Sequence, residues 1–164
     1  MKLLLENWRK YLNEANYSFD YDETLIKYRY EYDKAGNIED MVYVGPHEEN
    51  IQTLRDLAAQ GHTVYIVTSR KHPSEVSFTF EGDPPGPSEL AKEMGLPVAG
   101  IYYTGHEPKV FTLAKLGISK HWDDDQEEID HIVQYNRAHQ DNPIEYVLVE
   151  GQTNYKKKVT IDGR

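Results

Sequence analysis

Strand-like and helix-like patterns alternate along this chain from residue 46 onward, and this alternation constrains the possible fold more than any other feature. Short runs rich in β-branched residues predict strands at 63–67, 100–103, 118–122 and 144–149. Apolar positions at helical spacing predict helices at 46–60, 88–94, 108–116 and 125–138. Because parallel strands need a crossover, which a helix supplies, we expect an α/β protein. The predicted fold is a three-layer α/β/α, Rossmann-like sandwich around a mostly parallel five-stranded sheet.

The segment before residue 46 adds a first strand and a hairpin to this plan. Residues 17–20 have the pattern of a short strand that ends in an acidic turn. From 26 to 44, aromatic or apolar residues alternate with charged ones on both sides of a short turn that contains Gly36. That pattern is typical of a β-hairpin. We therefore expect one domain over residues 16–150, with a small β-hairpin flap at 26–44.

Both ends of the chain fall outside this predicted domain. Residues 1–15 place apolar side chains at helical spacing, which predicts an amphipathic helix that either packs on the domain or serves as a docking or targeting peptide. The sequence LNE at 12–14, followed by Ala15, resembles the cleavage signal of tailed-phage prohead proteases, and this resemblance implies a phage origin. Residues 151–164 form a basic tail.

Charge and composition exclude several classes of function. The net charge of −10 argues against a general nucleic-acid binder, because such binding depends on Lys and Arg that displace counterions, so nucleic acid is expected only as a substrate end. The chain has no cysteine, which excludes disulfides, cysteine-based zinc sites and thiol catalysis. We expect a cytoplasmic protein, in the host cytoplasm or the virion if it comes from a phage. No apolar run approaches the roughly 20 residues of a membrane helix, so no membrane association is expected.

Reactive side chains follow three of the predicted strands. Because parallel strands end at the same edge of a sheet, groups far apart in the sequence can converge there. A lysine also opens the helix that precedes the last of these strands. The residues concerned are Asp20 and Asp22, Thr68 and Ser69, Lys109, and Asp123, Asp124 and Asp125.

The acidic members of this set fit a magnesium-dependent phosphoryl transfer. A carboxylate nucleophile repels a phosphate dianion, and Mg²⁺, which prefers oxygen ligands, can bridge the two. Asp20 can serve as metal ligand and nucleophile, with Asp123 and Asp124 completing the metal site. A turn after the strand can bring Asp22 to the leaving oxygen as general acid and then base.

The remaining members can bind the phosphoryl group. Thr68 or Ser69 offers a hydroxyl to a phosphoryl oxygen, and Lys109 offers the cation that stabilises developing negative charge. Lys71, Lys115 and Lys120 compete with Lys109, which is preferred because it lies at a helix start that faces the strand ends.

With these residues in view, the chain resembles the haloacid dehalogenase superfamily over about residues 16–149. The motifs are FDYDETL at 19–25, IVTSR at 66–70, PK at 108–109 and WDDDQEEI at 122–129, and their order agrees with that family. The segments between the motifs leave no room for a large cap domain, so the resemblance is to a capless or small-cap member.

The resemblance implies a role for each matching residue. Asp20 would be the nucleophile that forms an aspartyl-phosphate, and Asp22 the general acid/base. Thr68 would bind phosphate, and Lys109 would neutralise charge. The implied Mg²⁺ ligands are Asp20, the backbone carbonyl of Asp22, and the pair Asp123 and Asp124.

Glu23 departs from the family pattern, which has glycine at this position. A side chain there narrows the mouth of the predicted site, and we group Glu23 with Thr68 and Ser69 as substrate-binding residues. The acid at position 22 favours a phosphatase over a dehalogenase, because the dehalogenase branches lack it. The expected activity is hydrolysis of a phosphomonoester, with a nucleotide or another small phosphoester as substrate.

Alternatives remain open from the sequence alone. An uncapped site also suits an end-processing enzyme similar to a polynucleotide 3′-phosphatase, and a non-catalytic binding protein can retain the same fold. Receiver domains combine similar groups, but their acidic pair precedes the acceptor, whereas the acidic run comes last here. His121 is either a packed residue or a metal ligand. Asp125 is expected to cap the following helix, with Glu128 completing a capping box.

Overall fold

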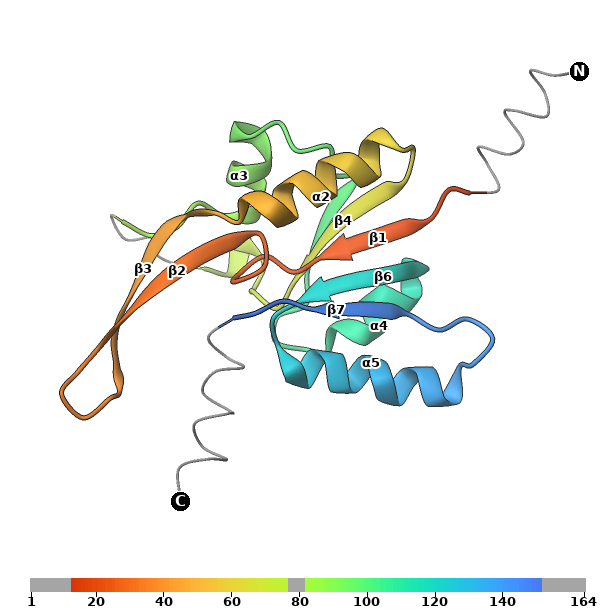
Figure 1. Ribbon diagram of the computed structural model, residues 1–164. Coiled ribbons are helices and arrows are strands. Elements are labelled where there is room, and N and C mark those ends of the chain that lie inside the picture. The colour runs from red at the N-terminus through yellow and green to blue at the C-terminus, as the bar shows by residue number, and fades with distance from the viewer. Residues whose placement is uncertain (1–12, 77–81, 152–164) are drawn as a thin grey trace, which may run out of the picture.

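The computed structural model describes residues 13–76 and 82–151, and its centre is a five-stranded sheet (Figure 1). The strands are β1 (Asn16–Phe19), β4 (Thr63–Thr68), β5 (Gly100–Tyr103), β6 (Ile118–Asp123) and β7 (Glu145–Leu148). They lie in the order β5-β4-β1-β6-β7, and every neighbouring pair is parallel. The prediction of a mostly parallel five-stranded sheet is therefore confirmed.

Helices cover both faces of this sheet. Helix α2 (Glu48–Ala59) and helix α3 (Pro87–Glu93) lie on one face, and helix α4 (Lys109–Lys115) and helix α5 (Gln126–Ala138) lie on the other (Figure 1). A short 3₁₀ helix at Pro73–Glu75 follows β4. This arrangement confirms the predicted three layers.

The alternation of side chains along β4 divides the core between the two faces. Ile66 is fully buried in the cluster that includes Leu54 of α2, whereas its neighbour Val67 is fully buried in the cluster that includes Leu113 of α4. Successive side chains of a strand point to opposite faces, so a run that is apolar throughout is needed only where both faces are covered. The TVYIV run therefore belongs to a strand enclosed by helices.

The order of the strands brings three strand ends together. From β1 at the centre, the chain builds β4 and β5 on one side and then returns to build β6 and β7 on the other side. In an open α/β sheet, ligands bind beyond the carboxyl ends of the strands where the order reverses in this way. Here that position lies at the ends of β1, β4 and β6.

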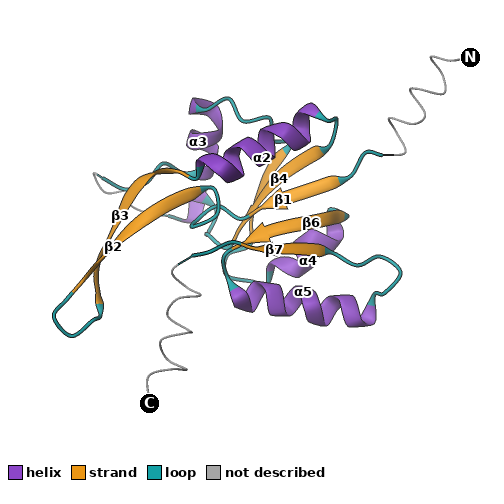
Figure 2. Ribbon diagram, viewed as in Figure 1, coloured by secondary structure: helices purple, strands orange, loops and turns teal. Residues whose placement is uncertain are grey.

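A two-stranded antiparallel sheet forms the predicted flap. Its strands are β2 (Ile26–Tyr32) and β3 (Ile38–Pro46), and Figure 2 shows them projecting away from the central sheet. At the tip, the backbone N–H groups of Ala35 and Asn37 both donate to Asp33 Oδ1 at 2.8 Å. Gly36 adopts φ 83°, a left-handed conformation that glycine tolerates without steric cost.

The predicted N-terminal helix and basic tail fall largely on 1–12 and 152–164, outside the described residues. Within the described part of the chain, no helix has the length and apolar character needed to cross a membrane.

Candidate active site

The ends of β1 and β6 bring the first and last acidic motifs into contact. Phe19 pairs with Trp122 in the parallel ladder, and the backbone N–H of Asp20 donates to the Trp122 carbonyl at 2.8 Å. Asp123 is the next residue along β6, so its side chain emerges beside Asp20. The sheet thus joins two groups that are about a hundred positions apart in the sequence.

Lys109 joins the two carboxylates at the start of α4. Its Nζ lies 2.8 Å from Asp20 Oδ1 and 2.7 Å from Asp123 Oδ2, and the lysine side chain is 3% exposed. Burial alone would lower the pKa of the ammonium, but the two carboxylates outweigh burial and raise it. Lys109 is therefore a permanent cation within this cluster.

The same lysine affects the two acids differently. Burial raises the pKa of Asp20; Lys109 opposes that shift, and the charges of Asp123 and Asp124 add to it. Burial also acts to raise the pKa of Asp123, but Lys109 and a hydrogen bond from His121 outweigh it and give a pKa of about 2. Asp123 thus remains ionised and keeps Lys109 in place.

His121 supports Asp123 from the interior of the protein. Its Nε2 lies 2.9 Å from Asp123 Oδ2, and its Nδ1 lies 2.7 Å from the Ser18 hydroxyl, with both His121 and Ser18 fully buried. If Nε2 donates to the carboxylate, Nδ1 accepts from the serine, so these partners select one tautomer. His121 therefore packs behind Asp123, as one of the two interpretations of the sequence proposed.

Asp124 completes a buried group of carboxylates. One ligand oxygen from each of Asp20, Asp123 and Asp124 lies within 4.8 Å of the others. Burial and the neighbouring Asp123 raise the pKa of Asp124 to about 7. The chain after β7 passes close over this residue: a Cβ on Gly151 would lie 2.7 Å from Asp124 Oδ2, so a larger side chain would displace one of the two.

This cluster fits a hard divalent cation. When all three buried carboxylates are ionised, one lysine ammonium leaves an excess of negative charge in a region of low dielectric, and a bound cation would offset it. Carboxylate oxygens are the ligands that Mg²⁺ prefers, and one or two of them, with waters and a substrate phosphate, satisfy it. Among the described residues, Asp20, Asp123 and Asp124 can supply that set.

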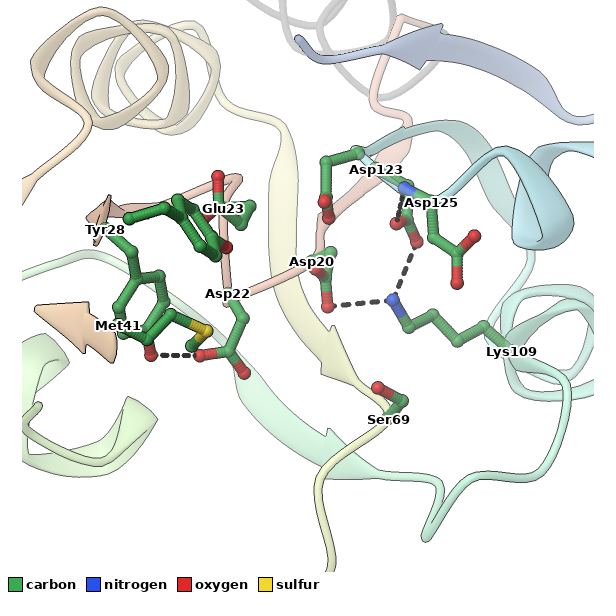
Figure 3. Close-up of a pocket in the computed structure, with 11 residues that line it drawn as sticks. Asp20, Asp22, Glu23, Tyr28, Met41, Ser69, Lys109, Asp123 and Asp125 are labelled. Atoms are coloured by element: carbon green, nitrogen blue, oxygen red, sulfur yellow. Dashed lines mark hydrogen bonds and ion pairs between the residues drawn. The ribbon is translucent and has the colours of Figure 1, made fainter. Parts of the chain in front are cut away.

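Asp22 is held by two partners from other elements. Arg70 Nε donates to its Oδ2 at 2.7 Å and Arg70 Nη2 to its Oδ1 at 2.6 Å, and the Tyr28 hydroxyl donates to Oδ1 at 2.6 Å. The Arg70 guanidinium also lies 4.9 Å from the centre of the Tyr21 ring. A bidentate arginine contact fixes a carboxylate in position as well as in charge. Asp22 therefore sits on the hairpin side of the site, apart from the lysine-centred cluster (Figure 3).

Glu23 occupies a strained position in the turn after β1. Its φ of 61° lies in the left-handed region, which costs a non-glycine residue roughly 1–2 kcal/mol. The Tyr30 hydroxyl from β2 donates to Glu23 Oε1. Burial and this hydrogen bond raise the pKa of Tyr30. The turn thus places a carboxylate against the hairpin.

These side chains surround one cavity of about 270 Å³. In Figure 3, Asp22, Glu23, Tyr28 and Met41 lie on one side, and Asp123, Asp125 and Lys109 lie on the other, with Asp20 between them. The lining residues are Asp20, Asp22, Glu23, Tyr28, Tyr30, Met41, Ser69, Lys109, Asp123, Asp124 and Asp125.

The two hydroxyl candidates are placed differently. Ser69 lines the cavity, whereas Thr68 is fully buried at the end of β4 and its Oγ1 accepts the backbone N–H of Arg70 at 3.3 Å. Thr68 is absent from the lining residues, so in this conformation its hydroxyl stabilises the loop that carries Ser69 and Arg70. The residues predicted from the sequence otherwise meet at this one cavity.

Sequence reasoning missed several contributors to the site. Asp125 caps α5 by accepting the Glu127 N–H at 2.9 Å, as predicted, but Glu128 does not form the expected capping box. It accepts the backbone N–H of Lys109 at 2.9 Å and so helps to hold the start of α4. Arg70 was part of the second motif but received no role. The available signal was that Arg70 closely follows the end of β4, at the edge of the sheet where the acidic turn after β1 was also expected.

Comparison with known proteins gives a structural likeness only. The chain is similar to the crystal structure of 3-deoxy-D-manno-octulosonate 8-phosphate phosphatase from Moraxella catarrhalis, in complex with magnesium ion, phosphate ion and a KDO molecule. The likeness covers 77% of this chain and 67% of that chain, with 18% sequence identity and a TM-score of 0.41. No family model and no curated protein matches the chain.

Proposed function

We propose that this chain is a Mg²⁺-dependent phosphomonoester hydrolase that works through an aspartyl-phosphate on Asp20. The observation that carries the proposal is the contact of Lys109 Nζ with both Asp20 and Asp123 inside the buried carboxylate cluster. A nucleophilic carboxylate, a fixed cation and a group of oxygen ligands are what phosphoryl transfer to aspartate needs. The same residues match the haloacid dehalogenase motifs in order.

The metal would be held by Asp20, Asp123 and Asp124, with the backbone carbonyl of Asp22 as a further ligand. When bound, Mg²⁺ supplies the positive charge that lets a carboxylate approach a phosphate dianion. Lys109 also neutralises part of the carboxylate charge, because its Nζ lies 2.8 Å from Asp20 Oδ1 and 2.7 Å from Asp123 Oδ2.

In the first step, a carboxylate oxygen of Asp20 forms a bond to phosphorus and the ester P–O bond breaks. For this step Asp22 carries a proton and gives it to the leaving oxygen, so an alcohol departs and Asp22 becomes the ionised carboxylate that Arg70 contacts. Lys109 stabilises the charge on the phosphoryl oxygens, and Ser69 donates its hydroxyl to one of them. Thr68 contributes indirectly, because its hydroxyl stabilises the loop that carries Ser69 and Arg70.

In the second step, a water molecule attacks the phosphorus of the aspartyl-phosphate. Asp22, now ionised, takes a proton from that water, and the bond between phosphorus and the Asp20 oxygen breaks. Inorganic phosphate leaves, and both carboxyl groups return to their starting states. One residue thus acts as acid and then as base.

The dimensions of the cavity support a small substrate. Ligand pockets for drug-sized molecules span roughly 300–1,000 Å³, and this cavity of about 270 Å³ is smaller. It accommodates a phosphoryl group and the adjoining part of the leaving group. We therefore retain a nucleotide or another small phosphoester as the substrate.

Turnover of a phosphoester panel tests the proposal. Purified protein should release phosphate from 4-nitrophenyl phosphate with Mg²⁺ and not with EDTA, and Asp20→Asn should abolish this activity. Arg29→Gln serves as a matched control, because Arg29 is exposed on the outer surface of the hairpin and contacts Glu31. Absence of Mg²⁺-dependent turnover across nucleotides, sugar phosphates and 3′-phosphorylated oligonucleotides would contradict the proposal.

A further inference from the structure

Glu23 holds a charged side chain in the cavity at a cost in backbone energy. Among the described residues, only Glu23 and His106 combine a side chain with a positive φ. Strain of this kind persists only where the surrounding structure holds the residue in place. One partner of Glu23 is Tyr30, whose hydroxyl donates to its carboxylate within the wall of the cavity.

The charges around the cavity are distributed unevenly. Among the described residues that line it, Lys109 is the one basic side chain, and it already contacts Asp20 and Asp123. Arg70 lies nearby, but its guanidinium forms a bidentate contact with Asp22. Positive charge is therefore concentrated at the lysine-centred end of the cavity.

The hairpin side of the cavity presents the Glu23 carboxylate and hydrogen-bond acceptors, and Asp22 on this side is paired with Arg70. The Tyr28 hydroxyl donates to Asp22 and accepts from Arg70 Nη2 at 3.2 Å, whereas the Tyr30 hydroxyl donates to Glu23 and its oxygen can still accept a hydrogen bond. Met41 adds an apolar surface on the same side of the cavity (Figure 3). A leaving group that extends along this side meets Glu23 and these acceptors.

We propose that Glu23 determines which leaving groups the site accepts, favouring neutral or cationic groups with hydrogen-bond donors and rejecting those with a second anion. This inference rests on the proposed phosphatase function. The transferred phosphoryl group is compensated by Lys109 and the metal, whereas a second anion would face the Glu23 carboxylate without a compensating cation from the described lining residues. Nucleoside monophosphates fit this class. Bisphosphates and nucleic-acid ends, which carry further phosphates, do not.

A matched set of small substrates measures this selectivity directly. Phosphoethanolamine, ethylene glycol monophosphate and phosphoglycolate share a two-carbon leaving group that is respectively cationic, neutral and anionic. For each protein, kcat/KM of one ester is divided by kcat/KM of another. Comparing this ratio between wild type and variant removes the contribution of the intrinsic reactivities of the esters. Phosphate release is the readout, with Mg²⁺ at saturation.

The variants separate the charge of Glu23 from its conformation. Glu23→Gln keeps the side-chain length and the left-handed backbone but removes the charge. Glu23→Gly removes both the charge and the backbone strain, so it should fold even if Glu23→Gln does not. Glu31→Gln is the control, because Glu31 lies next to Tyr30 on β2 but is exposed and outside the cavity.

We expect wild type to prefer the neutral and cationic esters. Both Glu23 variants should raise the kcat/KM of phosphoglycolate relative to ethylene glycol monophosphate by about tenfold, the effect of one charge pair several ångström apart near a protein surface. Glu31→Gln should leave the ratio at the wild-type value. If all three esters are hydrolysed and the ratio is the same in wild type and both Glu23 variants, the selectivity role is wrong. If wild type hydrolyses none of the three and no ester of the wider panel, the proposed function fails and this inference with it.

Discussion

Lys109 and Arg70 bring positive charge to two different carboxylates of the first motif. Lys109 contacts Asp20, and Arg70 contacts Asp22, although the two acids are separated by a single residue. Side chains two apart on an extended chain point to the same face, so the different directions of Asp20 and Asp22 come from the turn after β1. At the residue scale, the nucleophile and the proton-transfer group therefore have separate environments, which can be tested one at a time.

A double-mutant cycle tests whether Arg70 acts through Asp22. We expect Asp22→Asn to lower kcat by roughly 10²–10⁴, the usual contribution of general acid–base catalysis. Arg70→Gln should lower kcat by about tenfold or more, because Asp22 would lose the partner that orients it. The double variant should match Asp22→Asn alone, since both changes affect one carboxylate. Independent effects that multiply in the double variant would contradict this coupling.

The pKa of Asp124 predicts how stability depends on pH. Burial and Asp123 raise that pKa to about 7 from 3.8, and burial also raises the pKa of Asp20. A raised carboxyl pKa means that stability is greatest below the unfolded pKa and is lost as pH rises through the folded pKa. In EDTA, the free energy of unfolding should fall between about pH 4 and pH 7, by on the order of 4 kcal/mol for Asp124.

Denaturant unfolding at pH 5 and pH 8 measures this loss. Asp124→Asn should reduce the difference between the two pH values, and saturating Mg²⁺ should reduce it in wild type, because the cation favours the ionised cluster. Asp123 contributes in the opposite sense, since its pKa of about 2 stabilises the folded state above pH 3.8. An equal pH dependence in wild type and Asp124→Asn would contradict the assignment.

The hairpin is the element that shapes the outer wall of the site. Its distal part is largely exposed, whereas Tyr28 and Tyr43 near its base pack against the core. Arg29 pairs with Val42 across the two strands. The hairpin can therefore be shortened at that pair without disturbing its base.

Shortening the hairpin should separate stability from substrate binding. Replacing residues 30–41 with Asn-Gly would join Arg29 to Val42 through a two-residue turn, which suits antiparallel strands. We expect the free energy of unfolding to fall by roughly 1 kcal/mol, because the hydrogen bond from Tyr30 to Glu23 is lost while the packed base of the hairpin remains. KM should rise, because Tyr30 and Met41 leave the wall of the cavity. Global unfolding of the shortened protein would show that the distal hairpin has a structural role.

Element boundaries show where local sequence signals conflict. Apolar residues at helical spacing, followed by Gly61, predicted a helix over residues 46–60. Instead, Pro46 ends β3 and pairs with Ile26, and His47 caps α2 through its side chain. The pairing of Pro46 with β2 sets this boundary, and a contact between strands cannot be inferred from the residues next to Pro46.

For the whole molecule, the alternation of strands and helices predicted the fold, and the rule that parallel strand ends converge predicted that the reactive side chains would meet at one edge of the sheet. Asp20, Lys109 and Asp123 meet because β1 and β6 are neighbours, which follows from the order of elements. The pairing of Arg70 with Asp22 depends on turn conformations, and the contact of Glu128 with Lys109 depends on how α5 packs beside α4. Those two contacts could not be predicted from the sequence and were seen only in the structure.

Chemical trapping of the intermediate tests the central claim most directly. Asp22→Asn should accumulate the aspartyl-phosphate with 4-nitrophenyl phosphate, whose leaving group needs little protonation while the second step still needs a base. Borohydride reduces an acyl phosphate to an alcohol, so mass spectrometry of the peptide that contains residue 20 should find homoserine in place of Asp20. This conversion should require both Mg²⁺ and substrate. Release of 4-nitrophenol from this ester with Asp20 unmodified, and another residue phosphorylated or none, would contradict the account.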